Sequence, residues 1–473
     1  MKFLKTILIV ALLLGMGFSA QAQDASWRSQ VDRLIDQGEF TQASRLMAKL
    51  PRKVRKQQQW AIDSLNEVMR RIRKDFTLTP VEGRKQISDK YPQCTDENIS
   101  QWKQSRALEV MNIDGQEWWF RKAVRNLWLL APEFREQQGA DRDKEGDSYL
   151  KYYRQAMAAD PDAQGVRDWH HANITFTLDV KADAVPAGKT IRCWLPFPFE
   201  NLRQKNIKLL GSNHPATFSQ GSKHHTVYME AQAAKGQPTH FEFTFSYDVA
   251  ERHLCKQDLL ALVRPYDPKS EAVRRYTGTE YPQIVITDSI RDLAYDIAGF
   301  DENPVEAASR IYHWISERFP WAGAREYSTM RNIPEYVLQN RHGDCGMVTL
   351  LYITMVRSLG IPARWESGYM LHPGEVNYHD WAETYFEGVG WVPTDQSFGR
   401  SVVNTCLNDY YATGIDVYRL ATNEGIADQL SPKKRYLRSE TLDFQPGEVE
   451  WEGGNIYYDN FKSHITVNSF EKL

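Results

Sequence analysis

The chain has 473 residues, of which 42% are hydrophobic and 25% are charged, with 28 glycines and 21 prolines. This length suits about two to four folded domains, and the composition excludes a collagen-like, largely disordered or long coiled-coil protein. The 58 basic and 61 acidic residues leave a net charge of −3, which gives no reason to expect nucleic acid or an anionic lipid surface as a partner.

Residues 1–22 have the pattern of a secretory signal peptide. Lys2 and Lys5 supply the positive start, an apolar run extends over 7–18, and Ala20-Gln21-Ala22 places small residues before a cleavage point. An uncleaved anchor is the alternative, although the run is shorter than the ~20 residues of a membrane span. We expect cleavage, which leaves 56 basic and 61 acidic residues. The protein is then exported, periplasmic or secreted, without stable membrane insertion.

The five cysteines, at positions 94, 193, 255, 345 and 406, are far apart and contain no CxxC pair. This spacing predicts neither a zinc site nor a dense disulfide framework, and we expect no metal and no cofactor. Export implies an oxidising setting. If Cys345 is a free thiol, the other four cysteines are able to pair, and the sequence leaves their pairing open.

Residues 23–165 have mainly helical patterns. Apolar stripes on either side of Gly38 predict a helical hairpin, and 52–74 predicts a basic helix with a solvated face. A helix over 97–106, a turn at Asp114-Gly115 and a helix from Arg121 resemble a winged-helix-like part. In an acidic exported protein we interpret this part as a packing or docking module, not as a reader of DNA.

The period changes to two over residues 166–270. Ile174, Phe176, Leu178 and Val180 alternate with polar residues, and a similar alternation begins at Phe241. This pattern predicts a β-sandwich-like domain that gives structural support to the residues after it. Residues 285–400 then combine helices with strands, and 401–473, which lack strong periodicity, are expected to wrap around the core. The predicted fold class is α+β.

Cys345 stands in Gly343-Asp344-Cys345-Gly346, directly before an apolar helix that ends near Gly360. Unpaired N–H groups and the positive end of the helix dipole favour the thiolate, so we expect a lowered thiol pKa and a nucleophilic sulfur. The alternative is an ordinary buried helical cysteine.

His379 opens a predicted strand, and Asp395 follows a turn at 387–390 and a second strand. A returning hairpin brings Asp395 opposite or diagonal to His379, where a carboxylate can orient the imidazole. Asp380 is the second candidate for this role, but strand alternation points it away from the His379 face.

Five ordered segments of 341–395 resemble the transglutaminase-like superfamily of papain-like thiol enzymes. They are Arg341-His342-Gly343-Asp344-Cys345-Gly346, Leu359-Gly360-Ile361-Pro362-Ala363-Arg364, Ser367-Gly368-Tyr369, His379-Asp380-Trp381-Ala382-Glu383 and Gly390-Trp391-Val392-Pro393-Thr394-Asp395. The resemblance implies a core with an antiparallel sheet. It also implies Cys345 as nucleophile, His379 as base and Asp395 as orienting acid, with acyl transfer through a thioester. The Cys345 N–H and the Trp321 side chain are the candidate oxyanion donors, although Trp321 fits a core position equally well.

Three functions are compatible with these residues. We favour a hydrolase of peptide or amide bonds, by analogy with bacterial proteins that resemble the superfamily. The alternative is a transglutaminase that joins glutamine side chains to amines, and the absence of a calcium-loop pattern disfavours a calcium-activated enzyme of this kind. A non-catalytic binding protein is the third. The expected substrate is a peptide or protein, such as a cell-wall peptide or a glycopeptide.

Overall fold

The computed structural model describes residues 27–136, 159–219, 223–299, 303–398 and 410–473. The predicted signal peptide over 1–22 lies outside these residues, as does Cys406. The chain divides into two units, residues 1–138 and 139–473. Within the described ranges, no helix combines the length and apolar character that a membrane crossing requires.

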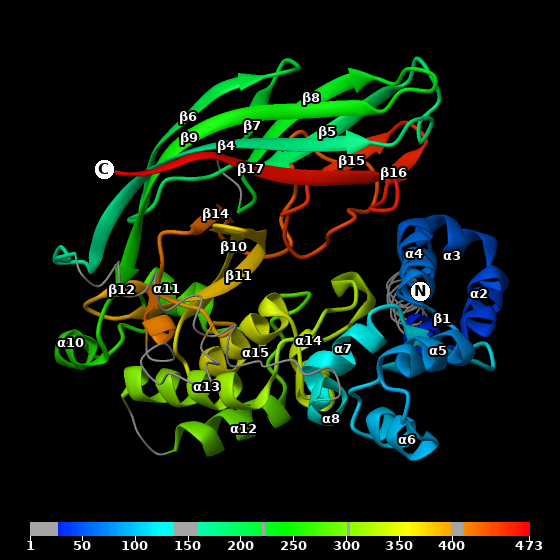
Figure 1. The fold of residues 1–473 in the computed structure, drawn as a ribbon, viewed down its shortest axis with the longest axis horizontal. Coiled ribbons are helices and arrows are strands. Elements are labelled where there is room, and N and C mark those ends of the chain that lie inside the picture. The colour runs from blue at the N-terminus through cyan, green and yellow to red at the C-terminus, as the bar shows by residue number, and fades with distance from the viewer. Residues whose placement is uncertain (1–26, 137–158, 220–222, 300–302, 399–409) are drawn as a thin grey trace, which may run out of the picture. The chain divides into compact units, whose positions relative to one another are not determined.

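The first unit consists of helices and a small antiparallel sheet (Figure 1). Gly38 has a φ of 77°, and a Cβ there would lie 1.8 Å from the Asn112 carbonyl oxygen, so the predicted helical turn requires glycine. The predicted Asp114-Gly115 turn joins β2 (Val110–Ile113) to β3 (Gln116–Phe120), and β1 (Phe76–Leu78) pairs with β3. The labelled helices of this unit are α2 (Phe40–Lys49), α3 (Arg52–Gln57), α4 (Gln59–Asp75), α5 (Pro80–Lys90), α6 (Asp96–Gln104), α7 (Ala123–Leu130) and α8 (Pro132–Glu136).

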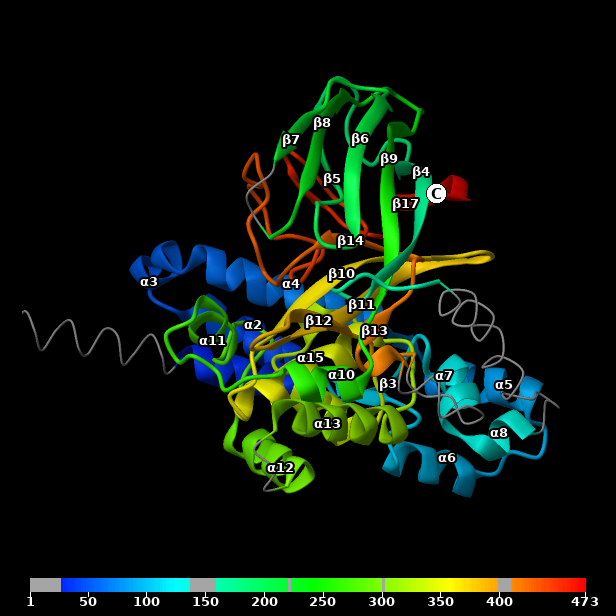
Figure 2. The same ribbon diagram turned by 90° about the vertical axis from the view of Figure 1, so that its left-hand side faces the viewer.

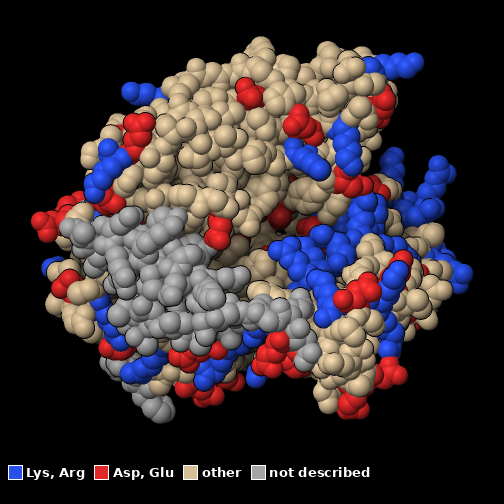
Figure 3. All heavy atoms as spheres, viewed as in Figure 1, with Lys and Arg blue, Asp and Glu red and all other residues tan. Residues whose placement is uncertain are grey.

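Residues 52–74, predicted as one basic helix with a solvated face, form two helices instead of one. Two helices, α3 and α4, meet at Gln58, and α4 buries one side. Ile62, Leu65 and Met69 recur three and four residues apart, which places them on one helical stripe, and that stripe packs into the core of the unit. Basic side chains nevertheless gather over α3 and α4 on their outer surface (Figure 3).

The second unit contains a β-sandwich of two antiparallel sheets (Figure 2). Ile174, Phe176, Leu178 and Val180 are each at most 1% exposed, as their alternation predicts. One sheet has the order β13-β9-β4-β17, with β6 also paired to β9, and the other has the order β16-β15-β5-β8-β7. The strands are β4 (Val166–Val180), β5 (Thr190–Pro196), β6 (Gln204–Ser212), β7 (Thr217–Ser219), β8 (Thr226–Gln232), β9 (Thr239–His253), β13 (Gly414–Ile415), β15 (Glu448–Trp451), β16 (Gly454–Ile456) and β17 (Phe461–Lys472).

The C-terminal segment is more than a wrapping, and the sandwich does not end at residue 270. Strand β17 pairs with β4 along its length, from Phe461 opposite Val180 to Lys472 opposite His170. Strand β15 pairs with β5, where Val449 lies opposite Cys193. Both sheets are thus completed by residues of 401–473, because β4 and β5 would otherwise leave backbone N–H and C=O groups unpaired at an edge.

The second sheet system of this unit has the antiparallel order β12-β11-β10-β14. In both ribbon views β10 and β11 lie between the sandwich and α15 (Figures 1 and 2). The Tyr352 hydroxyl of α15 bonds the Thr384 hydroxyl of β11 at 2.8 Å. The remaining elements are α10 (Lys256–Leu262), α11 (Glu271–Tyr276), α12 (Asp288–Ala298), α13 (Pro304–Arg318), the 3-10 turn η1 (Tyr327–Thr329), α14 (Ile333–Asn340), α15 (Cys345–Ser358), β10 (Ala363–His372), β11 (Glu375–Phe386), β12 (Gly390–Thr394) and β14 (Arg419–Asn423).

Candidate active site

Cys345 is the first residue of α15, as the sequence predicts. Asp344 is the N-cap: its carboxylate accepts a hydrogen bond from the Met347 N–H at 3.1 Å and from the Tyr327 hydroxyl at 2.5 Å. Cys345 retains partial exposure. At Gly346 a Cβ would lie 2.3 Å from the Tyr327 oxygen, so only glycine allows this tyrosine to approach the start of the helix.

His379 and Asp395 form a buried pair. His379 lies in β11, Asp395 directly follows β12, and the two are joined by a 2.6 Å hydrogen bond from Nε2 to Oδ2. Their exposed fractions are 3% and 0%. Because Nε2 is engaged by the carboxylate, Nδ1 is the nitrogen left for proton transfer. The structure therefore places the two residues as the predicted hairpin requires.

Arg419 of β14 anchors the far side of this pair. Its Nη2 lies 3.2 Å from Asp395 Oδ2, and its Nη1 contacts the Asp416 carboxylate, also at 3.2 Å. Burial opposes ionisation of Asp395, but His379 and Arg419 outweigh it and lower the pKa of the carboxyl. Burial also lowers the pKa of His379, with Asp395 opposing and Arg419 adding to the effect. The pair is thus neutral imidazole with ionised carboxylate near pH 7.

The partner of the Cys345 thiol is Asp380. The sulfur donates to Asp380 Oδ2 over 3.4 Å, and among the described residues no hydrogen bond joins Cys345 to His379. Strand alternation explains this: Asp380 shares the face of Thr384, against which α15 packs, whereas His379 shares the face of Trp381. Asp380 does not orient His379, so the second candidate for that role is excluded in this structure.

The expected lowering of the thiol pKa is wrong for this arrangement. Burial raises the pKa of Cys345 well above its ordinary value, and the carboxyls of Asp380 and Asp344 raise it further. The helix N-terminus is present as predicted, but its positive end is met by the N-cap carboxylate and by a second carboxyl from β11. The local sequence predicts the N-terminus of α15, but it does not predict that the Asp380 carboxyl packs against it.

Trp321 lies beside the segment that carries Cys345. Its backbone forms a parallel bridge with Gly343, and the Ala322 N–H donates to the Gly343 carbonyl at 3.1 Å. The Trp321 side chain is 39% exposed, so it is not a core residue. The core position that the sequence left open for Trp321 is therefore not the one it occupies.

Several residues of the site escaped sequence reasoning. Asp443 and Gln445 lie on the same side of β11 as Asp380, and Gln445 Nε2 donates to Asp380 Oδ1 at 2.7 Å. Arg419, Asp443 and Gln445 all belong to the segment without clear periodicity, so no local signal marked them. Strand alternation alone could have indicated the place of Asp380. It puts Asp380 on the same face of β11 as the small residue Ala382, and that face packs against the helix that begins at Cys345.

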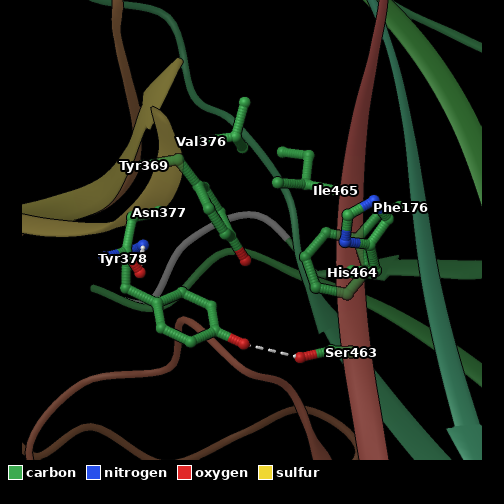
Figure 4. A pocket seen from close by; sticks show the side chains of 8 residues that line it. All are labelled: Phe176, Tyr369, Val376, Asn377, Tyr378, Ser463, His464 and Ile465. Atoms are coloured by element: carbon green, nitrogen blue, oxygen red, sulfur yellow. Dashed lines mark hydrogen bonds between the residues drawn. The ribbon is translucent and has the colours of Figure 1, made fainter. Parts of the chain in front are cut away.

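A small pocket opens where the β10–β11 hairpin meets the sandwich (Figure 4). Its volume is about 190 Å³, and the Tyr378 hydroxyl bonds the Ser463 hydroxyl across it at 2.8 Å. Tyr369 and Tyr378 line one wall, and His464 and Ile465 of β17 line the other. The pocket thus lies next to the strand residue that precedes His379.

Free thiols are present at Cys94, Cys193, Cys255 and Cys345. The parts of the chain that the structure describes contain no group of three or more His, Cys, Asp or Glu side chains placed to hold a metal ion.

The sequence profile described as the Transglutaminase-like superfamily matches residues 291–396, which include Cys345, His379 and Asp395. A curated protein of Haemophilus influenzae without a described function is 23% identical over 263 residues, which are 49% of this chain and 69% of that protein. The Bacillus subtilis protein YebA, also without a described function, is 23% identical over 134 residues, and the match spans 18% of its length.

Among solved structures, a candidate cysteine protease from Cytophaga hutchinsonii matches 65% of this chain and 98% of its own, with 15% identity and a TM-score of 0.41. The periplasmic domain of TgpA from Pseudomonas aeruginosa matches 48% of this chain and 88% of its own, with 15% identity and a TM-score of 0.26. Red sea bream transglutaminase matches 56% of this chain and 53% of its own, with 12% identity and a TM-score of 0.23.

Proposed function

We propose, from the premise that residues 291–396 form a transglutaminase-like domain, that this protein is an exported thiol enzyme that hydrolyses peptide or amide bonds through a Cys345 thioester. The observation that carries the proposal is the buried 2.6 Å pair of His379 and Asp395. His379 belongs to β11, the strand against which the Cys345 helix packs, and Asp395 directly follows β12. A neutral imidazole held by an ionised carboxylate is the arrangement that a general base requires.

In the proposed reaction, Cys345 Sγ exchanges its contact with Asp380 for one with His379, the residue that precedes Asp380 in β11. His379 Nδ1 accepts the thiol proton, and the thiolate attacks the substrate carbonyl. The resulting oxyanion is held by the Cys345 backbone N–H and the Trp321 indole N–H, each such donor being worth about 3–4 kcal/mol. The imidazolium protonates the leaving amine and the thioester forms.

Hydrolysis completes the cycle. His379 then takes a proton from water, the hydroxide oxygen attacks the thioester carbonyl, and Cys345 leaves as thiolate and regains its proton. Attack by a primary amine in place of water would make the same enzyme a transglutaminase, which is the second candidate. Export rests on the leader-like residues 1–22. The proposed substrate is a peptide or protein, such as a cell-wall peptide or a glycopeptide.

Labelling of the thiol tests the nucleophile. A thiol-reactive probe, followed by intact mass and peptide mapping, should modify the native enzyme at Cys345 and leave that position unlabelled in the Cys345→Ala variant. Cys255 offers a matched control, because it too lies at the N-terminus of a helix and its sulfur lies 3.0 Å from the Asp258 carboxylate. Equal rapid labelling of wild type and Cys345→Ala, with loss of labelling in Cys255→Ala, would contradict the assignment.

The acceptor is tested separately. A glutamine-containing peptide is incubated with the enzyme, with and without a tagged primary amine, and the products are separated by mass. Deamidated or cleaved peptide as the main product supports hydrolysis. If the tagged peptide is the main product, the hydrolase assignment is wrong and the enzyme is a transglutaminase. Profiling of a peptide library with wild type and Cys345→Ala then identifies the substrate class.

A further inference from the structure

Asp380 touches the candidate nucleophile and also touches a second carboxyl. Asp380 Oδ2 accepts the Cys345 thiol at 3.4 Å, and its side chain is hydrogen-bonded to the side chain of Asp443. The two carboxyls are 4% and 3% exposed. Two buried carboxylates in hydrogen-bond contact cannot both be ionised without strong repulsion, so the pair must hold one proton.

The surroundings decide which carboxyl holds that proton. Asp443 accepts from the Ser367 side chain and the Gln445 backbone N–H and lies in the field of Arg438, all of which favour its ionised form. Asp380 accepts from Gln445 Nε2 at 2.7 Å, which favours its ionised form, but its burial and the charges of Asp443 and Asp344 oppose ionisation and prevail. The pKa of Asp380 is raised well above its ordinary value, chiefly by burial, and that of Asp443 is raised to about 6.

The neighbouring elements supply further groups that bear on this proton. The side chains that face the pair, beyond those already named, are Tyr327 of η1, Glu440 of the C-terminal segment, and Tyr369 and Tyr378 of β10 and β11. Near neutral pH the pair therefore carries a single negative charge, which resides on Asp443, away from the sulfur.

We propose that Asp443 is a positioning residue for the nucleophile: by sharing one proton with Asp380, it keeps the carboxyl that touches Cys345 Sγ in its neutral form, so that a thiolate can form beside it. This inference rests on the proposed role of Cys345. It assigns a function to the C-terminal segment, which places Asp443 and Gln445 on the face of β11 opposite to His379.

Removal of the Asp443 carboxyl is expected to change Asp380 from its neutral form to a carboxylate. In Asp443→Asn the introduced amide and Gln445 Nε2 both donate toward Asp380, so Asp380 becomes a carboxylate at 3.4 Å from the sulfur. The thiolate is then disfavoured, and an upward shift of one pKa unit slows alkylation about tenfold at a pH below the thiol pKa. Asp380→Asn replaces the neutral acid with a neutral amide and leaves the thiol at least as reactive as in wild type.

The test is the pH–rate profile for alkylation of Cys345 by iodoacetamide, followed by peptide mass mapping on the full chain between pH 6 and 9.5. We expect Asp443→Asn to be slower by about tenfold or more, and Asp380→Asn to match or exceed wild type. The double variant Asp380→Asn/Asp443→Asn is expected to regain the wild-type rate, because an amide then stands at the position that touches the sulfur and Asp344 is unchanged from wild type.

Two outcomes would overturn the proposal: an unchanged profile in Asp443→Asn, or a double variant as slow as Asp443→Asn, which would mean structural damage instead of charge. If Asp443→Asn does not fold, a slower profile in Asp380→Asn than in wild type overturns it equally. Thermal melting of each variant reports folding. Alkylation needs no substrate, so these results are separate from a failure of the proposed hydrolysis, which would show as equal turnover by wild type and Cys345→Ala.

Discussion

Replacement of Asp395 by asparagine tests how the site holds its base. The two carboxylate oxygens of Asp395 meet different donors: Oδ2 accepts from His379 Nε2 at 2.6 Å and from Arg419 Nη2 at 3.2 Å, whereas Oδ1 accepts from the Ser397 N–H at 3.2 Å. An asparagine must place its amide nitrogen at one of these positions. Two donors oppose it at Oδ2 and one at Oδ1, so the amide oxygen should occupy the Oδ2 position.

This orientation preserves the histidine tautomer. His379 still donates from Nε2, and Nδ1 stays available to accept the thiol proton. What is lost is the charge of the acceptor. A hydrogen bond to a charged group contributes about 1.5–3 kcal/mol and a neutral one about 0.5–1.5, so the imidazolium formed in the reaction loses about 1–1.5 kcal/mol. Acylation should slow by about 5–15-fold.

Alanine at the same position removes both acceptors. His379 and Arg419, which are 3% and 0% exposed, then lose a buried partner, although Arg419 retains Asp416. We expect a loss of about 3 kcal/mol in the free energy of unfolding, at the low end for a broken buried pair. Acylation should fall by about 10²–10⁴-fold, the contribution of an oriented base.

The assay is single-turnover acylation of Cys345 by an activated phenyl ester, with phenolate release followed optically and the acyl-enzyme by intact mass. Urea denaturation of each variant gives the free energy of unfolding. Equal, severe losses in Asp395→Asn and Asp395→Ala would refute the reasoning, because they would mean that the amide nitrogen faces His379 and imposes the other tautomer.

Three further predictions concern the pH dependence, the packing and the oxyanion site. Burial raises the pKa of Glu251 to about 8, so the folded chain binds a proton there that the unfolded chain has released. Stability should therefore fall between about pH 5 and 8, by up to about 1.4 kcal/mol per unit, and Glu251→Gln should flatten the slope in urea denaturation; an unaltered slope contradicts this. Gly368→Ala places a Cβ 2.0 Å from a backbone oxygen of β14 and should lower the melting temperature, whereas Gly211→Ala, which meets nothing within 4 Å, should not; equal melting of both refutes the packing argument. Trp321→Phe removes the indole N–H and should slow acylation by about 10²-fold, while a change below about twofold would exclude Trp321 as an oxyanion donor.

The C-terminal segment shows why local pattern did not predict the complete fold. Strand β17 is half exposed along much of its length, so its alternation is weak, and its place beside β4 depends on an edge that is far away in the sequence. Strand β4 was predictable because it lies inside its sheet, between β9 and β17, and its inward-facing residues are all apolar and buried. Hydrophobic alternation appears in a sequence where one face of a strand is buried, so a strand that is only partly buried shows weak alternation.

The helix that begins at Cys345 and the hairpin that pairs His379 with Asp395 were determined by the sequence itself. A helix start, a strand and a turn are local features, and the order of the motifs places the three residues in one domain. Tertiary structure alone decided the protonation state of the sulfur. Asp380 reaches Cys345 from β11, and burial of the thiol, together with the carboxyls of Asp380 and Asp344, raises the pKa of a thiol that its own helix would lower.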